Sequence, residues 1–187
     1  MKLALTVLTL ALLVTAAGAT TVDFDSFTPL DTCMSPISTG GLSFSATLNC
    51  GASPYLYVWD GSSPNGNGTP ALIYAGFGNG SGVTVTQTSG GAFNLYSVDM
   101  TISWYDANPS EVITVNGNPI TLIQGLQTYN LNLLGVTSVT FSDVPSGSGY
   151  WLMDNVVYSP TPEPGTMVLL GSGLLAGIGV VRRKMNL

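Results

Sequence analysis

The chain has 187 residues and a formal net charge of −6, yet only 7% of its residues are charged and none is histidine. All ten acidic residues lie between Asp23 and Glu163, whereas the four basic residues lie at the ends: Lys2, Arg182, Arg183 and Lys184. An interior without Lys or Arg excludes nucleic-acid binding, which needs cations against phosphates. It also lacks histidine, the commonest general base and metal ligand. Because 45% of the residues are hydrophobic, we expect a folded chain rather than a disordered one.

The N-terminus has the parts of a secretory signal peptide. It begins with Met1-Lys2, continues with an apolar run over 3–14 and reaches an Ala-x-Ala site at Ala17-Gly18-Ala19. We predict that residues 1–19 are removed by cleavage after Ala19 during export by the general secretion machinery. The apolar run is short for a membrane span, so an uncleaved anchor is the weaker alternative.

The C-terminus combines a linker, an apolar stretch and a basic end. Residues 159–164 are rich in proline and include Pro162-Glu163-Pro164. Residues 165–187 then give an apolar stretch followed by the basic cluster. The apolar part, about 17 residues, is at the short end for a transmembrane helix. The basic cluster would remain cytoplasmic, which leaves the preceding domain outside.

This order of motifs resembles the PEP-CTERM sorting signal. The residues that carry the resemblance are Pro162, Glu163, Pro164, Arg182, Arg183 and Lys184. The resemblance implies that exosortase, a membrane protease-transpeptidase, processes the chain. It further implies an exported protein that is transiently anchored in the inner membrane and then reaches the cell surface or extracellular space. The expected host is a Gram-negative bacterium that makes extracellular polysaccharide.

The segment between the two ends, residues 20–158, is typical of an all-β domain. Several short runs alternate apolar and polar residues or are rich in β-branched residues: 42–48, 83–86, 111–116, 119–124, 126–133, 136–141 and 150–158. Regular spacing of short strands and turns predicts a single antiparallel β-sandwich. The dipeptide Asn116-Gly117 predicts a hairpin turn. The apolar phase changes between Leu95 and Val98, which predicts a β-bulge near Ser97.

Two patches resemble the first and last strands of galactose-binding-like jelly rolls, a fold that many carbohydrate-binding modules share. They are Val22-Asp23-Phe24-Asp25 and the segment from Trp151 to Val156. The resemblance implies a jelly-roll-like sandwich and a structural calcium ion held in part by Asp25 and Asp154. No other cofactor is expected. The alternative is that both acids are ordinary surface or turn residues.

Aromatic residues alternate along one expected strand. Tyr55, Tyr57 and Trp59 share a face, and exposed aromatic rings can stack on sugars. The alternative, and the one that the pattern favours, is that this face belongs to the hydrophobic core.

Two cysteines, Cys33 and Cys50, occur in this exported chain, so a disulfide between them is expected. The alternative is a pair of buried free thiols.

No residue pattern predicts catalysis. Asp106 and Glu111 flank a turn-like segment, and a glycosidase needs two carboxyls about 5–10 Å apart, but we expect acids at such a turn to be solvated. No Gly-x-Ser-x-Gly motif is present. The first hypothesis is therefore a non-catalytic protein of the cell surface or extracellular matrix. The alternative is a surface-displayed carbohydrate-binding module with extracellular polysaccharide as its ligand; a glycoside-active enzyme is the least favoured.

Overall fold

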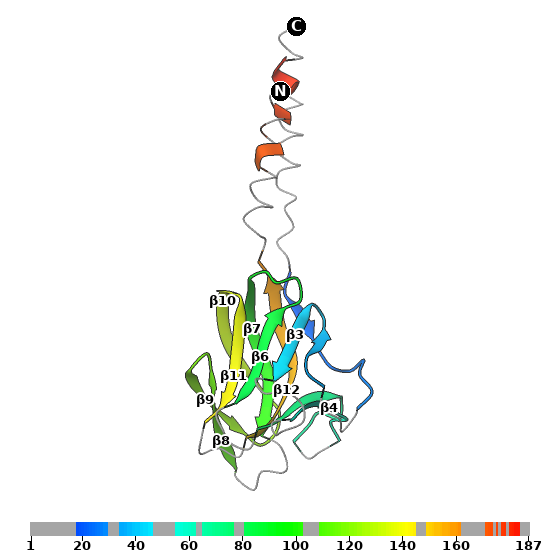
Figure 1. Cartoon of the computed structure of the whole chain (residues 1–187), viewed down its shortest axis with the longest axis vertical. Coiled ribbons are helices and arrows are strands. Elements are labelled where there is room, and N and C mark those ends of the chain that lie inside the picture. The colour runs from blue at the N-terminus through cyan, green and yellow to red at the C-terminus, as the bar shows by residue number, and fades with distance from the viewer. Residues whose placement is uncertain are drawn as a thin grey trace. The chain divides into compact units, whose positions relative to one another are not determined.

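The computed structural model describes most of the β domain and part of the C-terminal tail (Figure 1). The described residues are 18–29, 34–46, 55–62, 65–76, 81–102, 109–144 and 149–161, with 171–173, 175, 177–178 and 180–183 in the tail. The chain divides into two compact units, and the β domain comprises Ala19–Pro160. The prediction of an all-β antiparallel sandwich is confirmed, because every strand pair that the structure describes is antiparallel.

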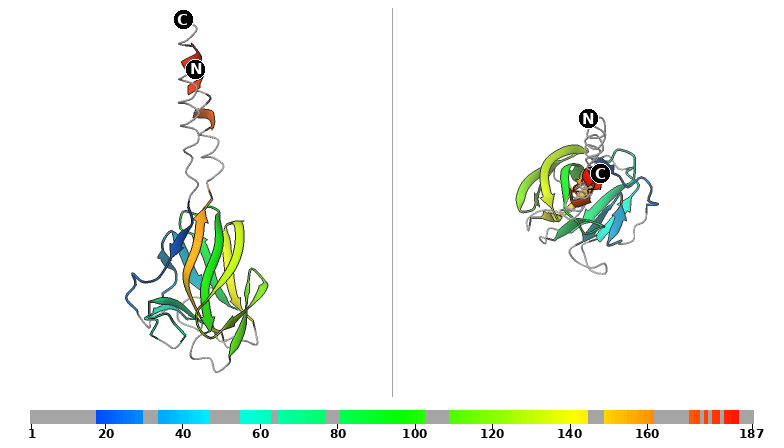
Figure 2. Two further views of the ribbon diagram at one scale, coloured as in Figure 1. Left: turned by 180° about the vertical axis from the view of Figure 1, so that it is seen from behind. Right: turned by 90° about the horizontal axis from the view of Figure 1, so that it is seen from above.

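The strands form two six-stranded sheets (Figures 1 and 2). The first sheet, sheet A, has the order β10 (Gln127–Val136), β7 (Phe93–Ile102), β12 (Tyr150–Pro160), β5 (Ala71–Ala75) and β4 (Tyr55–Trp59), with β1 (Thr20–Val22) pairing with β12. The second sheet, sheet B, has the order β2 (Ile37–Thr39), β3 (Leu42–Ala46), β6 (Gly82–Gln87), β11 (Ser138–Asp143), β8 (Ser110–Val115) and β9 (Asn118–Ile123).

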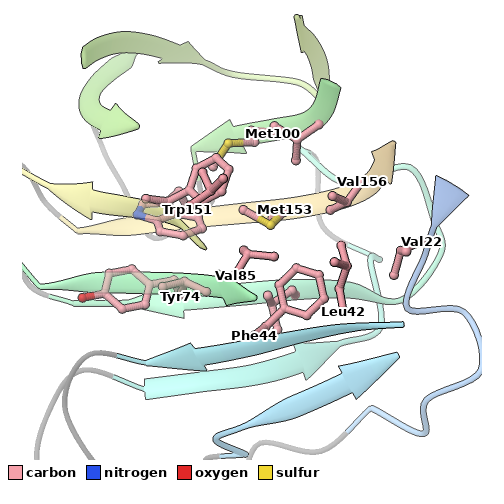
Figure 3. Packing of buried hydrophobic residues seen from close by; sticks show 14 of the residues in the cluster. Val22, Leu42, Phe44, Tyr74, Val85, Met100, Trp151, Met153 and Val156 are labelled. Atoms are coloured by element: carbon pink, nitrogen blue, oxygen red, sulfur yellow. The ribbon is translucent and has the colours of Figure 1, made fainter. Parts of the chain in front are cut away.

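The hydrophobic core lies between the two sheets (Figure 3). Phe24 follows β1 and packs edge-to-face on Phe44 of β3, with ring centroids 5.2 Å apart. Trp151 of β12 packs on Tyr74 of β5, with centroids 4.8 Å apart. All four side chains are fully buried. Burial of these rings, together with the aliphatic side chains of the same core, holds the two sheets together.

The two local turn and bulge predictions are confirmed. Asn116 and Gly117 have positive φ angles of 49° and 80°, as the tight turn between β8 and β9 requires. The pairing of β7 with β12 is irregular at Ser97, which lies opposite Val157. Between the pairs Val157–Ser97 and Tyr158–Leu95, β7 contributes one extra residue, Tyr96, which accounts for the phase change. Between Asp154–Asp99 and Val157–Ser97, β12 contributes one extra residue, and Asn155 within that stretch has a φ of 46°.

The C-terminal tail is described only in part. The described residues of the segment 171–183 are helical, including Arg182 and Arg183. Within the residues that the structure describes, we find no helix with the length and apolar character needed to cross a membrane. Pro162, Glu163, Pro164 and Lys184 lie outside the described residues, as do Cys33 and Cys50. The disulfide and the membrane span therefore stay predictions.

Candidate functional site

Two aromatic residues of β4, Tyr57 and Trp59, face away from the core. Leu56 and Val58 are fully buried between the sheets. Tyr57 and Trp59 alternate with them and are half-buried on the opposite, outer face of sheet A. The interpretation of this face as the core face is therefore wrong for Tyr57 and Trp59. Tyr55 belongs to the same strand, and its side chain lies outside the described residues.

The two aromatic rings pack against a layer of apolar side chains. Tyr57 and Trp59 pack against a separate small cluster formed by Ala71, Ile73 and Leu152. Tyr57 pairs with Ile73 across β4 and β5, and Ile73 pairs with Leu152 across β5 and β12. We call Tyr57 and Trp59 the aromatic platform. Because its rings are only partly covered, the platform presents apolar surface to solvent on the outer face of sheet A.

A row of polar residues continues from the platform across the same face. Trp59 pairs with Ala71, and the register of β5 with β12, continued by one residue, places Asp154 opposite Ala71. Asp154 pairs with Asp99 of β7, and Asp99 pairs with Thr128 of β10. Since neighbouring strands lie about 4.8 Å apart, the backbones of Trp59 and Asp154 are roughly 10 Å apart. We call Asp154, Asn155, Asp99 and Thr128 the polar row.

Asp154 anchors the loop between β4 and β5. Asn67 donates a hydrogen bond from Nδ2 to Asp154 Oδ2 at 3.0 Å, and the Thr69 hydroxyl lies 3.5 Å from the same oxygen. Asn65, in the same loop, donates to the carbonyl of Ile102 at 3.1 Å. These bonds tie the loop to β12 and β7, and only 1% of Asp154 is exposed. The loop that follows Trp59 is thus fixed beside the aromatic platform.

The rest of the polar row is held by Asn155 and Thr128. The backbone N–H of Asn155 donates to Asp154 Oδ1 at 2.8 Å, and its side chain donates from Nδ2 to Asp99 Oδ2 at 3.0 Å. The Thr128 hydroxyl donates to Asp99 Oδ1 at 2.5 Å. Because Asn155 has a left-handed backbone at the bulge, its N–H and its side chain can donate to two different carboxylates.

Burial raises the pKa of Asp154 to about 6 from its usual 3.8. The hydrogen bonds from Asn155 and Asn67 oppose this shift, and the negative charges of Asp25 and Asp99 add to it. No Lys or Arg occurs between Lys2 and Arg182 to offset these charges. Asp154 is therefore a carboxyl that titrates well above the ordinary range.

We expect this carboxyl to make domain stability depend on pH. The pKa of Asp154 in the folded domain lies above its unfolded value, so the neutral side chain fits the fold better than the ionised one. This stabilisation is fully present below pH 3.8 and is lost as the pH rises through about 6. Urea unfolding at about pH 4 and about pH 7.5 measures the change. Over this interval the free energy of unfolding of the wild type should fall by about 2 kcal/mol more than that of Asp154→Asn, after allowance for solvent screening. An equal loss in both proteins would contradict the assignment.

Asp25 lies in a turn after β1 and is exposed. Its charge reaches Asp154, but the hydrogen bonds to the Asp154 carboxylate come from protein donors. Among the described residues, no group of three or more His, Cys, Asp or Glu side chains is arranged to hold a metal ion. Calcium coordination by Asp25 and Asp154 stays a prediction.

The expectation that Glu111 is solvated is wrong. Glu111 is only 5% exposed, and its Oε1 accepts a hydrogen bond from the backbone N–H of Gly149 at 2.7 Å. Asp143, which the sequence reasoning did not single out, is also buried and accepts a hydrogen bond from Trp151 Nε1 at 2.9 Å. Glu111 thus links β8 to the residue before β12, and Asp143 links the end of β11 to β12. Asp106 lies outside the described residues.

Comparison with known proteins identifies the tail. Residues 160–184 match the family model described as the PEP-CTERM protein-sorting motif. The chain carries a PEP-CTERM sorting motif. The motif indicates an exported protein. No curated protein matches the chain.

Solved structures that match this chain in part include carbohydrate-binding modules. The module CtCBM11 has 15% identity and a TM-score of 0.43, with 81% of this chain and 100% of that chain covered. The C-terminal family 22 carbohydrate-binding module of Clostridium thermocellum Xyn10B has 9% identity and a TM-score of 0.43, with 79% and 98% covered.

A longer structure is also similar. It contains the CBM22-1 and GH10 modules of Clostridium thermocellum xylanase 10B complexed with xylohexaose, and has 13% identity and a TM-score of 0.41. Although 65% of this chain is covered, the match spans only 26% of that chain. An exo-β-agarase matches over 25% of its length.

Proposed function

We propose that this chain is an exported, non-catalytic surface protein whose β domain binds polysaccharide through the outer face of sheet A. The observation that carries the proposal is the aromatic platform of Tyr57 and Trp59, which lies outside the core and beside the polar row. In this account exosortase recognises the sorting motif, and the motif delivers the domain to the surface of a Gram-negative cell.

The platform has the chemistry that sugar rings need. A pyranose presents an apolar C–H face, which stacks on aromatic rings, and an edge of hydroxyl groups, which forms hydrogen bonds. Tyr57 and Trp59 are held by Ala71, Ile73 and Leu152, so they lose little rotamer freedom when a ligand binds. A fixed apolar surface that is already partly dehydrated is suited to stacking.

The polar row lies at a distance that a short glycan can span. Asp154 lies roughly 10 Å from Trp59, a length of about two sugar units, and Asp99 lies one strand further. Asp99 is half-buried, and its carboxylate is oriented by Asn155 and Thr128. The Asp154 carboxylate is covered by Asn67 and Thr69, so the carboxylate that a longer glycan stacked on Trp59 would meet is that of Asp99.

We expect Trp59→Ala to weaken glycan binding strongly. The variant removes the larger ring of the platform, and if its stacking is comparable with base–aromatic stacking, about 1–3 kcal/mol, affinity should fall by roughly 5- to 150-fold. The full-length protein, recovered from membranes in mild detergent, is applied to an array of microbial and plant polysaccharides. Wild type should bind a subset of them, and Trp59→Ala should bind every member of that subset more weakly.

Leu134→Ala provides the matched control. Leu134 is 69% exposed in β10, at the opposite edge of the same sheet, so its removal also takes apolar surface from sheet A. It should leave the array pattern unchanged. If wild type binds no polysaccharide, or if both variants bind as wild type does, the proposed function is wrong.

A further inference from the structure

We propose that the outer face of sheet A selects uncharged polysaccharides and rejects anionic ones, such as polymers of uronic acids. This inference rests on the proposed function and names the ligand class of the same site. It starts from the charge distribution: no Lys, Arg or His occurs between Lys2 and Arg182, so the whole β domain lacks a basic side chain.

A protein that binds a carboxylate or sulfate normally meets it with Arg, Lys or protonated His. None of these is present in the domain. Within the described part of the domain there is also no helix whose N-terminus could receive an anion. An acidic sugar bound at the platform would therefore lose its hydration without gaining a cation in exchange.

Three neutral side chains at the polar row donate hydrogen bonds to its own carboxylates. Asn67 donates to Asp154, the side chain of Asn155 donates to Asp99, and Thr128 donates to Asp99. Of the two carboxylates, only that of Asp99 is partly exposed, and it accepts hydrogen bonds. The ligand must supply the protons, and the hydroxyl groups of an uncharged sugar do so, whereas an ionised carboxyl group cannot.

Electrostatic repulsion acts in the same direction. The negative charges of Asp25 and Asp99 both act on Asp154, so the three carboxyls lie near one another on this side of the domain. The screening length at 0.1 M salt is about 10 Å, comparable with the distance from Trp59 to this cluster. A polymer with an acid on each unit would bring several like charges within this range, and like charges at an interface suppress binding of the wrong partner.

Backbone-matched pairs of polysaccharides test the proposal. The full chain in mild detergent is applied to galactan and polygalacturonate, mannan and polymannuronate, and glucan and carboxymethyl glucan, with about 1 mM calcium chloride or with chelator. In the pair that is bound, the uncharged member should be retained at least about tenfold better, and Trp59→Ala should weaken this binding. Asp99→Asn removes one negative charge with little change of shape and should narrow the preference several-fold.

The outcomes separate the two proposals. Binding of an anionic member as strong as that of its uncharged partner, dependent on Trp59 and in either calcium condition, overturns the selectivity and leaves the proposed function standing. A preference that Asp99→Asn leaves unchanged contradicts the role given to this charge. Binding to none of the six polymers and to none of the array overturns both.

Discussion

Glu163→Ala is expected to stop exosortase processing. Glu163 is the central residue of the Pro-Glu-Pro segment within the matched motif. An apolar helix followed by a basic cluster needs no such segment to remain in a membrane, so the segment is the part that an enzyme would recognise. In a host with exosortase, wild type should lose its tail and reach the surface, whereas the variant should stay in the membrane with its tail attached.

Intact mass and cell fractionation measure this effect. Thr161→Ala is the matched control, because it changes a neighbouring residue between β12 and the Pro-Glu-Pro segment. It should be processed as wild type is. The mass of the mature protein also shows whether the chain begins at Thr20, as cleavage after Ala19 predicts. Normal processing and surface delivery of Glu163→Ala would contradict the account of the tail.

Gly82→Ala should destabilise the β domain severely. Gly82 is the first residue of β6 and pairs with Ser142 of β11. A Cβ atom at Gly82 would lie 1.8 Å from the carbonyl oxygen of Phe141 and 2.7 Å from the Cα of Ser142. Both are backbone atoms in the middle of sheet B, so the added methyl group can be accommodated only if the ladder between β6 and β11 opens. We expect a loss of about 3 kcal/mol or more.

Denaturant unfolding of the β domain measures the loss. Thr86→Ala is the control, since Thr86 lies in the same strand and is half-buried. This substitution should lower the free energy of unfolding by no more than about 1 kcal/mol. Equal stability of Gly82→Ala and wild type would mean that β6 and β11 do not approach each other as closely as the structure requires.

The turn and the bulge are predicted correctly because each depends only on residues that are adjacent in the chain. The turn at Asn116-Gly117 follows from the φ angles that these two residues tolerate, and the bulge at Ser97 follows from a phase change within one strand. Strand β5 was not predicted, because Ala71–Ala75 is buried on both faces and shows no alternation.

The face of β4 could not be assigned from its sequence. Every residue of Tyr55–Trp59 is apolar or aromatic, so period-two alternation does not distinguish core from surface. The choice depends on the rest of the fold, which places Leu56 and Val58 inside.

The contacts of the polar row could not be predicted from the sequence either. Asp154 was singled out through a family resemblance, but its partner Asn67 is 87 residues away in the chain. The bonds of Asn155 and Thr128 to Asp99 likewise join residues 56 and 29 positions apart. No local pattern reports such contacts, because they arise from loop packing and sheet order. The burial of Glu111 was missed for the same reason.

The claim that the aromatic platform binds glycan is tested most directly by the indole N–H signals of the tryptophans. The protein is labelled with ¹⁵N and titrated with a soluble oligosaccharide of the polymer that the array binds best. The signal of Trp59, assigned with Trp59→Ala, should shift in proportion to saturation. The signal of Trp151, which is fully buried and donates to Asp143, should stay in place. An unchanged Trp59 signal at saturating oligosaccharide would contradict the account.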